Sequence, residues 1–212
     1  MSKLNFKAIV FLIALITGIA NAQIADNHVI RVGYYIPQAA KSGMILGYQT
    51  GKAVDDRVSY GFSVDLYTRK YVEKVEIDTT GLDLATVNTN RVNIDFSTYM
   101  LPIQANVIVN MPVDVSGMSP YVSGGLGFAF LLNRELNYIN DEKDTRFFSA
   151  FVWNLAGGVS YELGTNSAAR FELFYNRALL KGARDKTEAG FPIYDELNMS
   201  GLGLRLGLVM DL

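Results

Sequence analysis

The sequence predicts an all-β fold: an eight-stranded antiparallel up-and-down transmembrane β-barrel. Three observations support this prediction. Apolar and polar residues alternate with a period of two through most of the 212 residues, as they do in strands with two different faces. The residues of the polar face are mostly small, and the few charges among them balance. Short connections alternate with long ones along the chain.

Composition excludes several classes of function. The net charge is −2 and 19% of the residues are charged, which argues against a nucleic-acid partner. The chain has no cysteine, so it can form no disulfide framework, no thiolate metal site and no lipid-anchored N-terminal cysteine.

The N-terminus predicts a cleaved signal peptide over residues 1–22. Lys3 and Lys7 precede an unbroken apolar run at 8–16, and Ala20-Asn21-Ala22 forms a small-x-small cleavage site before Gln23. The apolar run is shorter than the roughly 20 residues that a spanning helix needs. The mature chain, 23–212, is therefore expected to form a single barrel domain.

Period-two alternation defines the strands. It is clearest at 58–69 and recurs at 147–163 and 201–212. The fourth predicted strand changes phase, so a bulge is expected near residues 97–99, ahead of Pro102. Strands are predicted at 28–37, 43–54, 57–77, 92–112, 118–138, 147–164, 168–181 and 197–212.

The connections predict the orientation of the barrel. Those around 55–56, 114–118 and 164–167 are short, as is the first connection at 38–42. Those at 78–91, 139–146 and 182–196 are longer and richer in charge. If the chain starts and ends in the periplasm, the first three are periplasmic turns and the long ones are extracellular loops, an asymmetry typical of outer-membrane barrels.

The position of the charges distinguishes a membrane barrel from a soluble one. The polar face is otherwise rich in Gly, Ser, Ala and Asn, as a narrow lumen requires, while the opposite face is apolar and suited to lipid. We expect the charged residues to fill the lumen in two ion-paired layers. The outer layer holds Arg69 near Asp95, and the layer nearer the periplasm gathers Arg31, Glu162, Arg170, Glu172 and Arg205. The predicted lumen residues are Arg31, Asp65, Arg69, Asp95, Glu162, Arg170, Glu172 and Arg205.

Two segments resemble known proteins. The C-terminal octet 205–212, with Arg205, Gly207, Met210 and Leu212, resembles the β-signal recognised by the barrel-assembly machinery, although most such signals end in phenylalanine. Segments 101–106 and 119–127 are similar to the central hairpin of small outer-membrane barrel proteins of the OmpA-like and OmpX-like superfamily.

This resemblance implies a Gram-negative cell envelope. The protein would reach the outer membrane after Sec export, with help from periplasmic chaperones and the barrel-assembly machinery. Its expected surroundings are outer-membrane lipid and lipopolysaccharide, with no nucleic acid, and the expected state is a monomer.

The residues argue against enzymatic chemistry. Acyl hydrolases need a histidine base beside a serine, but the single histidine, His28, lies near the periplasmic start of the first strand without a serine or acidic neighbour in sequence. The acidic loop 140–144 lacks the glycine turn and distal glutamate of an EF-hand. We therefore predict no catalytic residue, no metal and no cofactor.

Three functions remain open at this point. The first is a non-enzymatic barrel that contributes to envelope integrity or makes surface contacts through its loops. The second is a narrow porin-like channel for small solutes. The third, a lipid-modifying enzyme, is disfavoured by the lack of a suitable histidine.

Overall fold

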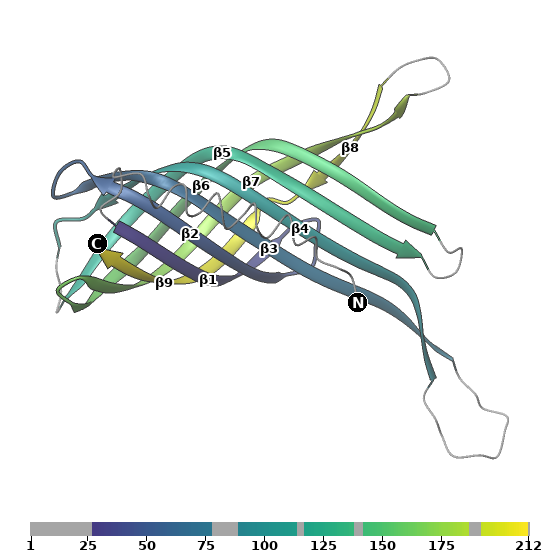
Figure 1. The fold of residues 1–212 in the computed structure, drawn as a ribbon, viewed down its shortest axis with the longest axis horizontal. Helices are drawn as coiled ribbons and strands as arrows, with labels where there is room; N and C mark the ends of the chain where they lie inside the picture. The colour runs from purple at the N-terminus through teal and green to yellow at the C-terminus, as the bar shows by residue number, and fades with distance from the viewer. Residues whose placement is uncertain (1–26, 78–88, 114–116, 138–141, 187–191, 212) are drawn as a thin grey trace.

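The computed structural model describes residues 27–77, 89–113, 117–137, 142–186 and 192–211 (Figure 1). Over these ranges, no helix has the length and hydropathy to cross a bilayer. The strands are β1 (Asn27–Pro37), β2 (Gly43–Ala53), β3 (Val58–Ile77), β4 (Thr89–Asn110), β5 (Met118–Asn137), β6 (Glu142–Gly164), β7 (Ser167–Lys186), β8 (Pro192–Asn198) and β9 (Gly201–Asp211).

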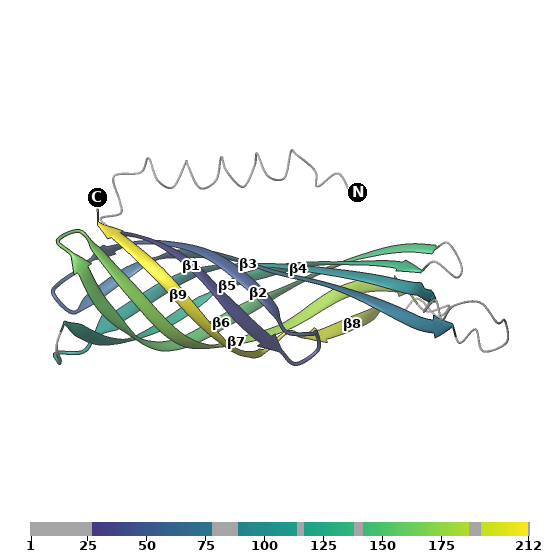
Figure 2. The same ribbon diagram turned by 90° about the horizontal axis from the view of Figure 1, so that it is seen from below.

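The antiparallel sheet closes on itself. Consecutive strands from β1 to β7 pair with each other, and β9 pairs with β7 on one side and with β1 on the other (Figure 2). Both β8 and β9 pair with β7, and the register does not change between Leu179 opposite Asn198 and Asn176 opposite Gly201. These two segments are parts of one barrel strand, so the described residues form a closed barrel of eight strands, as predicted.

Met199 and Ser200 interrupt this last barrel strand. The Met199 carbonyl accepts a hydrogen bond from the hydroxyl of Tyr35, which lies inside the lumen. The backbone N–H of Ala178 donates to Ser200 Oγ at 3.1 Å in place of a strand carbonyl. The interruption therefore leaves the neighbouring backbone groups with partners.

The two ends of the barrel differ in how far their strands project. We call the end that holds Asn27, Asp211 and the turns after β2, β4 and β6 the short-turn end. At the opposite hairpin end, the pairs β3–β4, β5–β6 and β7–β8 project well beyond the β1–β2 turn (Figure 1).

The projecting strands correct two predicted loops. β6 begins at Glu142, inside the predicted loop 139–146, while β7 and β8 occupy most of the predicted loop 182–196. Backbone pairing within a hairpin needs no apolar face, so a charged sequence does not mark the end of the strand. Residues 78–88, in the remaining long connection, lie outside the described part of the chain.

The predicted bulge at residues 97–99 is wrong. β4 pairs with β5 in one register from Ile94 to Asn110, and the shift against β3 lies between Glu73 and Lys74, next to Asn93. Ile94 and Phe96 belong to the projecting part of β4, and their side chains lie outside the described residues. The phase change at residues 97–99 therefore does not coincide with a bulge.

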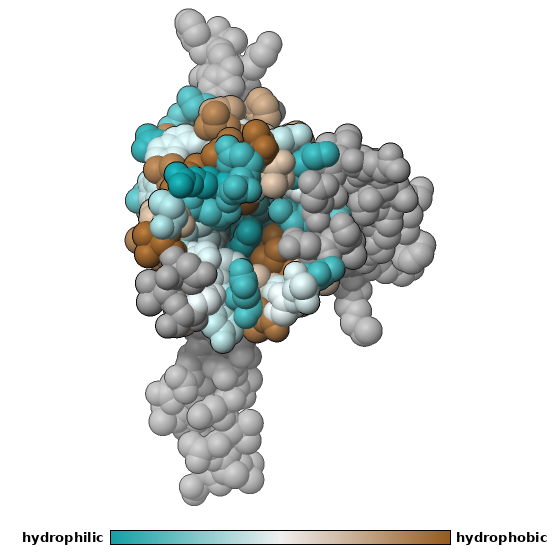
Figure 3. All heavy atoms as spheres, turned by 90° about the vertical axis from the view of Figure 1, so that its left-hand side faces the viewer, coloured by the Kyte–Doolittle hydropathy of each residue, from teal (hydrophilic) through white to brown (hydrophobic). Residues whose placement is uncertain are grey.

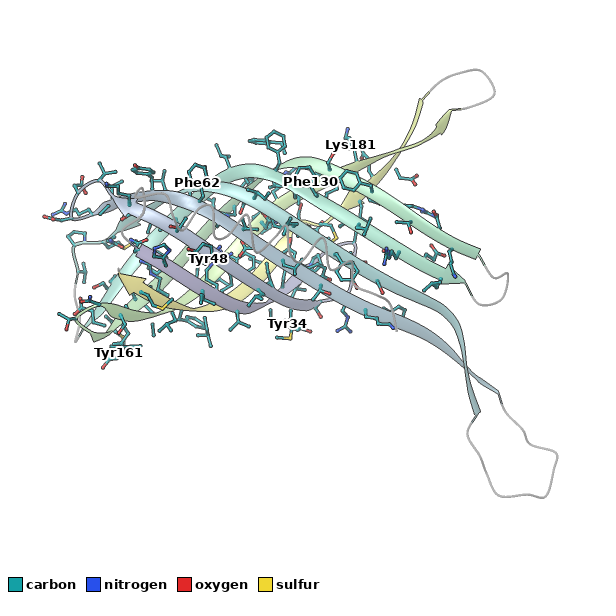
Figure 4. The ribbon with its side chains drawn as sticks, in the orientation of Figure 1. Tyr34, Tyr48, Phe62, Phe130, Tyr161 and Lys181 are labelled. Atoms are coloured by element: carbon teal, nitrogen blue, oxygen red, sulfur yellow. The ribbon has the colours of Figure 1, made fainter. Side chains whose placement is uncertain are left out.

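Burial is inverted relative to a water-soluble barrel. Large apolar side chains point away from the wall, as Phe62 does in Figure 4. Phe62 is 55% exposed, and Leu206 is 59% exposed. Charged side chains such as Arg31 and Asp65 are buried on the inner face. At the short-turn end, polar residues gather around the centre and apolar ones around the circumference (Figure 3). This is the pattern of a barrel surrounded by hydrocarbon.

Candidate functional site: the filled lumen

An ion-pair cluster crosses the middle of the lumen. It consists of Arg31 on β1, Asp65 on β3, Glu172 on β7 and Arg205 on β9, all buried. Asp65 accepts hydrogen bonds from Arg31 Nη2 at 3.0 Å and Arg205 Nη1 at 3.1 Å, and Arg205 Nε donates to Glu172 Oε1 at 2.7 Å. Two cations and two anions balance, which removes much of the cost of burying charge.

Neutral groups complete this cluster. Arg31 Nη1 donates to Gln49 Oε1 at 2.8 Å, and the Tyr121 hydroxyl donates to Glu172 Oε2 at 3.1 Å. The Arg205 guanidinium carbon also lies 4.1 Å from the centroid of the Phe174 ring, within cation–π range. Each charged side chain is therefore held by several neighbours.

Amide side chains fill the lumen beside the cluster and toward the short-turn end. Asn154 Nδ2 donates to Gln104 Oε1 at 2.6 Å, and Asn106 Nδ2 donates to Ser63 Oγ at 2.7 Å. All four side chains are buried. Hydrogen bonding between them offsets the loss of water that burial imposes.

Glycines make room for these contacts. A Cβ atom at Gly47 would overlap the carboxylate of Asp65, and one at Gly125 would overlap the amide of Asn106. At Gly203 it would overlap the Phe174 ring. At these three positions, glycine allows a large polar or aromatic side chain to approach closely across a narrow lumen.

An apolar cluster fills the lumen between the ion-pair cluster and the hairpin end. The Tyr35 ring lies 5.6 Å from the rings of both Tyr67 and Phe174, measured between centroids. The β1–β2 turn covers this cluster, because Ala40 packs against it and the Tyr67 hydroxyl donates to the Lys41 carbonyl. Its larger members include Tyr35, Tyr67, Met100, Leu131, Phe148, Phe174, Leu180 and Met199.

Little space is left between the two clusters. A cavity lined by Tyr35, Asp65, Phe174, Arg205 and their neighbours has a volume of about 10 Å³. A single water molecule needs roughly 10–15 Å³. The middle of the lumen is therefore filled by side chains.

The structure brings together only part of the predicted lumen set. Arg31, Asp65, Glu172 and Arg205 meet, but Arg170 lies near Tyr121, with its guanidinium carbon 5.1 Å from the ring centroid. Glu162 is exposed at the short-turn end. Arg69 lies opposite Thr98 and Asp95 opposite Val72, and the Asp95 side chain lies outside the described residues. The expected pairing of Arg69 with Asp95 in an outer layer therefore stays a prediction.

Sequence reasoning missed the uncharged lumen residues. Tyr35, Tyr67, Tyr121 and Phe174 fall on the same alternation phase as the interior charges, which was the available signal. Aromatic residues are common at the outer surface of membrane barrels, so an inward position is not apparent from residue type alone.

The structure also places His28 and most of the predicted assembly signal. His28 Nδ1 lies 2.6 Å from the Tyr48 hydroxyl, close to the short-turn end. Within the described ranges, no three His, Asp or Glu side chains are grouped so that they could hold a metal ion. Of the predicted assembly signal, Arg205 and Gly207 face the lumen on β9, Met210 pairs with His28, and Leu212 lies outside the described residues.

Comparison with known proteins identifies the fold. Neither a protein-family model nor a curated protein matches the chain. Neisserial surface protein A is 14% identical over 88% of this chain and 96% of its own, with a TM-score of 0.54. A major outer membrane protein from Thermus thermophilus is 12% identical over 88% and 98%, with a TM-score of 0.55. The chain therefore has the fold of the small eight-stranded outer-membrane barrels.

Proposed function

We propose that this protein is a non-enzymatic outer-membrane barrel with a closed lumen, which acts in envelope integrity or through surface contacts. The observation that carries this proposal is the side-chain filling of the lumen. The cavity between the ion-pair cluster and the apolar cluster has a volume of about 10 Å³, too small for a solute, which supports a closed lumen. This argues against the alternative, a narrow channel for small solutes.

The outward face supports a membrane location. β1, β2 and β9 have eleven residues each, which matches the roughly 9–11 residues that a tilted strand needs to cross a bilayer. Tyr34 and Phe130 project from the wall nearer the hairpin end, and Tyr161 lies at the short-turn end (Figure 4). Aromatic rings at both boundaries are typical of outer-membrane barrels.

The hairpin end supports a surface role. On this proposal, that end faces the outside of the cell and the short-turn end faces the periplasm. Arg146 on β6 lies 2.6 Å from Asp144, 3.9 Å from Glu135 and 3.8 Å from Asp195, so it connects three projecting strands. An ordered, charged edge above the membrane suits contacts with lipopolysaccharide or with other molecules at the cell surface.

Biogenesis belongs to the same proposal. We expect cleavage before Gln23 and recognition of Arg205, Gly207, Met210 and Leu212 by the barrel-assembly machinery. The mature chain should start at Gln23 and fractionate with outer membranes. Recovery in the soluble periplasmic fraction would overturn the membrane location.

Conductance tests the closed lumen. Protein refolded into a planar bilayer is expected to give no steady ionic current, and Phe62→Ala, a change on the outward face, should behave in the same way. A steady current from the wild type would place the channel hypothesis first. Heat-modifiable migration on a gel verifies that each sample contains folded barrel.

A further inference from the structure

Two glycines differ from the other strand glycines. Apart from glycines at the ends of strands, Gly124 on β5 and Gly157 on β6 are the glycines of the described strands that occupy outward-facing positions. Gly124 lies between Val107 and Leu155 in the pairing register, whereas Gly157 follows Leu155 by two residues and pairs with Val122. The two are diagonal neighbours on the outer wall.

The fold does not require glycine at these positions. A Cβ atom at Gly124 would approach Leu155 Cδ2 at 3.5 Å, and one at Gly157 would approach the Tyr121 carbonyl oxygen at 3.9 Å. Both are ordinary van der Waals distances, in contrast to the overlaps at Gly47 and Gly125. The missing side chains therefore leave space outside the barrel without serving a contact inside it.

That space, which we call the wall hollow, has a volume of about 590 Å³. It extends from Val107 and Val109 on β4 to Tyr175 on β7 and Leu202 on β9, and its lining is predominantly apolar. Its lining comes from five neighbouring strands of the curved outer wall, β4, β5, β6, β7 and β9, and it is open to the outside of the barrel.

Charge at one end of the wall hollow indicates the kind of occupant. Val109 is next to Asn110, whose backbone N–H donates to the Arg57 carbonyl at 2.7 Å, in the turn between β2 and β3. Arg57 is exposed, and so are Asp55 and Asp56 in the same turn. One cation beside two carboxylates complements a headgroup that carries both a phosphate and an ammonium group.

We propose that the wall hollow holds an acyl chain of a zwitterionic phospholipid from the periplasmic leaflet, with its headgroup at the turn that contains Arg57. The apolar lining accepts the chain, Arg57 attracts the phosphate, and Asp55 and Asp56 attract the ammonium group. This inference rests on the proposed membrane location, because the outward wall meets lipid only there.

Native mass spectrometry tests the wall hollow. The full mature barrel is refolded in vesicles that contain phosphatidylethanolamine and phosphatidylglycerol with identical chains, and is then released in detergent. The wild type should retain one phosphatidylethanolamine in preference to phosphatidylglycerol. Gly124→Leu/Gly157→Leu, which fills the hollow, should retain roughly tenfold less.

Ala105→Leu is the matched control, because Ala105 is exposed on the outward face of β4 and does not line the hollow. This variant should retain lipid as the wild type does. Arg57→Gln should remove the preference for phosphatidylethanolamine. All variants are first checked for folding by heat-modifiable migration.

Three results would overturn the proposal: equal lipid retention in the filled variant and in Ala105→Leu, a preference for phosphatidylglycerol, or a dimer that disappears when the hollow is filled. The dimer would make a second copy the occupant. Outer-membrane fractionation of the same variants separates a failure of this inference from a failure of the membrane location.

Trp153 provides a second measurement. It is the single tryptophan of the chain, and its ring centroid lies 5.7 Å from that of Tyr175, which lines the wall hollow. Phosphatidylethanolamine with brominated chains should quench the Trp153 fluorescence of the wild type more strongly than random contact with bulk lipid would. In Gly124→Leu/Gly157→Leu, the quenching should follow the bulk lipid composition. Equal quenching in this variant and in the wild type would argue against an acyl chain held in the wall hollow.

Discussion

Arg205 shows how strongly one interior residue depends on its partners. It pairs with both Asp65 and Glu172 and is 4% exposed. Arg205→Ala would leave three buried charges with a net charge of −1, and breaking such a buried pair typically costs about 3–5 kcal/mol. We expect a lower temperature for conversion of the heat-modifiable folded band to the unfolded band.

Lys181 supplies the control for that experiment. Its Nζ lies 3.0 Å from Glu196, but both side chains are about two-thirds exposed. Exposed pairs of this kind contribute about 0–1 kcal/mol. Lys181→Ala should therefore leave the conversion temperature nearly unchanged, and an equally small effect of Arg205→Ala would contradict the importance of the ion-pair cluster.

Gly47 is expected to tolerate no side chain. In Gly47→Ala the new methyl group would displace the Asp65 carboxylate, which is held from two sides by Arg31 and Arg205. We expect a lower conversion temperature and less folded protein after refolding. Gly124→Ala adds the same methyl group on the outward face at an ordinary distance and should behave like the wild type.

The sequence predicts that Arg31, Glu172 and Arg205 gather on adjoining strands, but it does not predict that Asp65 joins them. Alternation places Arg31, Asp65, Glu172 and Arg205 on one face. Arg31 and Asp65, however, are separated by β2 and meet across Gly47. Such contacts depend on the tilt and stagger of the closed barrel, which alternation within single strands does not contain.

Among the connecting elements, the turn between β2 and β3 is expected to change with pH. The backbone N–H groups of Arg57 and Val58 both donate to Asp55 Oδ1 at 2.7 Å and lower the pKa of this carboxyl group. Because the folded pKa is lowered, the contribution of Asp55 is complete above its ordinary pKa of about 3.9 and is lost as pH falls through the folded value.

NMR titration of the Arg57 and Val58 amide protons checks this expectation. Their chemical shifts should stay constant at neutral pH and change only in acid, below about pH 4. In Asp55→Asn the amide oxygen can still accept a hydrogen bond but does not titrate, so the acid transition should vanish. A transition between pH 5 and 7 would contradict the assignment to Asp55.

The bounds of β1, β2, β3 and β5 were predicted to within about one residue, whereas β6 and β7 extend beyond their predicted bounds at the hairpin end. β1 and β2 match the alternation closely, since both lie within the apolar band. β6 starts at Glu142 and β7 ends at Lys186, several residues beyond the predicted bounds. Charged residues at those ends are held by pairing with the partner strand, a long-range property that a single strand's sequence does not report.

Orientation is a property of the whole molecule and can be tested from outside the cell. Lys143 is exposed at the hairpin end, and Asn166 is exposed in the turn between β6 and β7 at the short-turn end. A cysteine at Lys143 should react with a membrane-impermeant maleimide on intact cells, whereas one at Asn166 should react only after lysis. The reverse labelling pattern would invert the proposed topology.

The four members of the ion-pair cluster are distributed from the first strand to the last, and this has a consequence for the order of folding. Arg31 and Asp65 can meet once β1 to β3 have paired, but Glu172 gains its cation only when β9 arrives with Arg205. An unfinished barrel would therefore hold an uncompensated carboxylate beside hydrocarbon. Completion of the charge balance coincides with closure of the β1–β9 seam, so the last strand to be synthesised also completes the electrostatics of the interior.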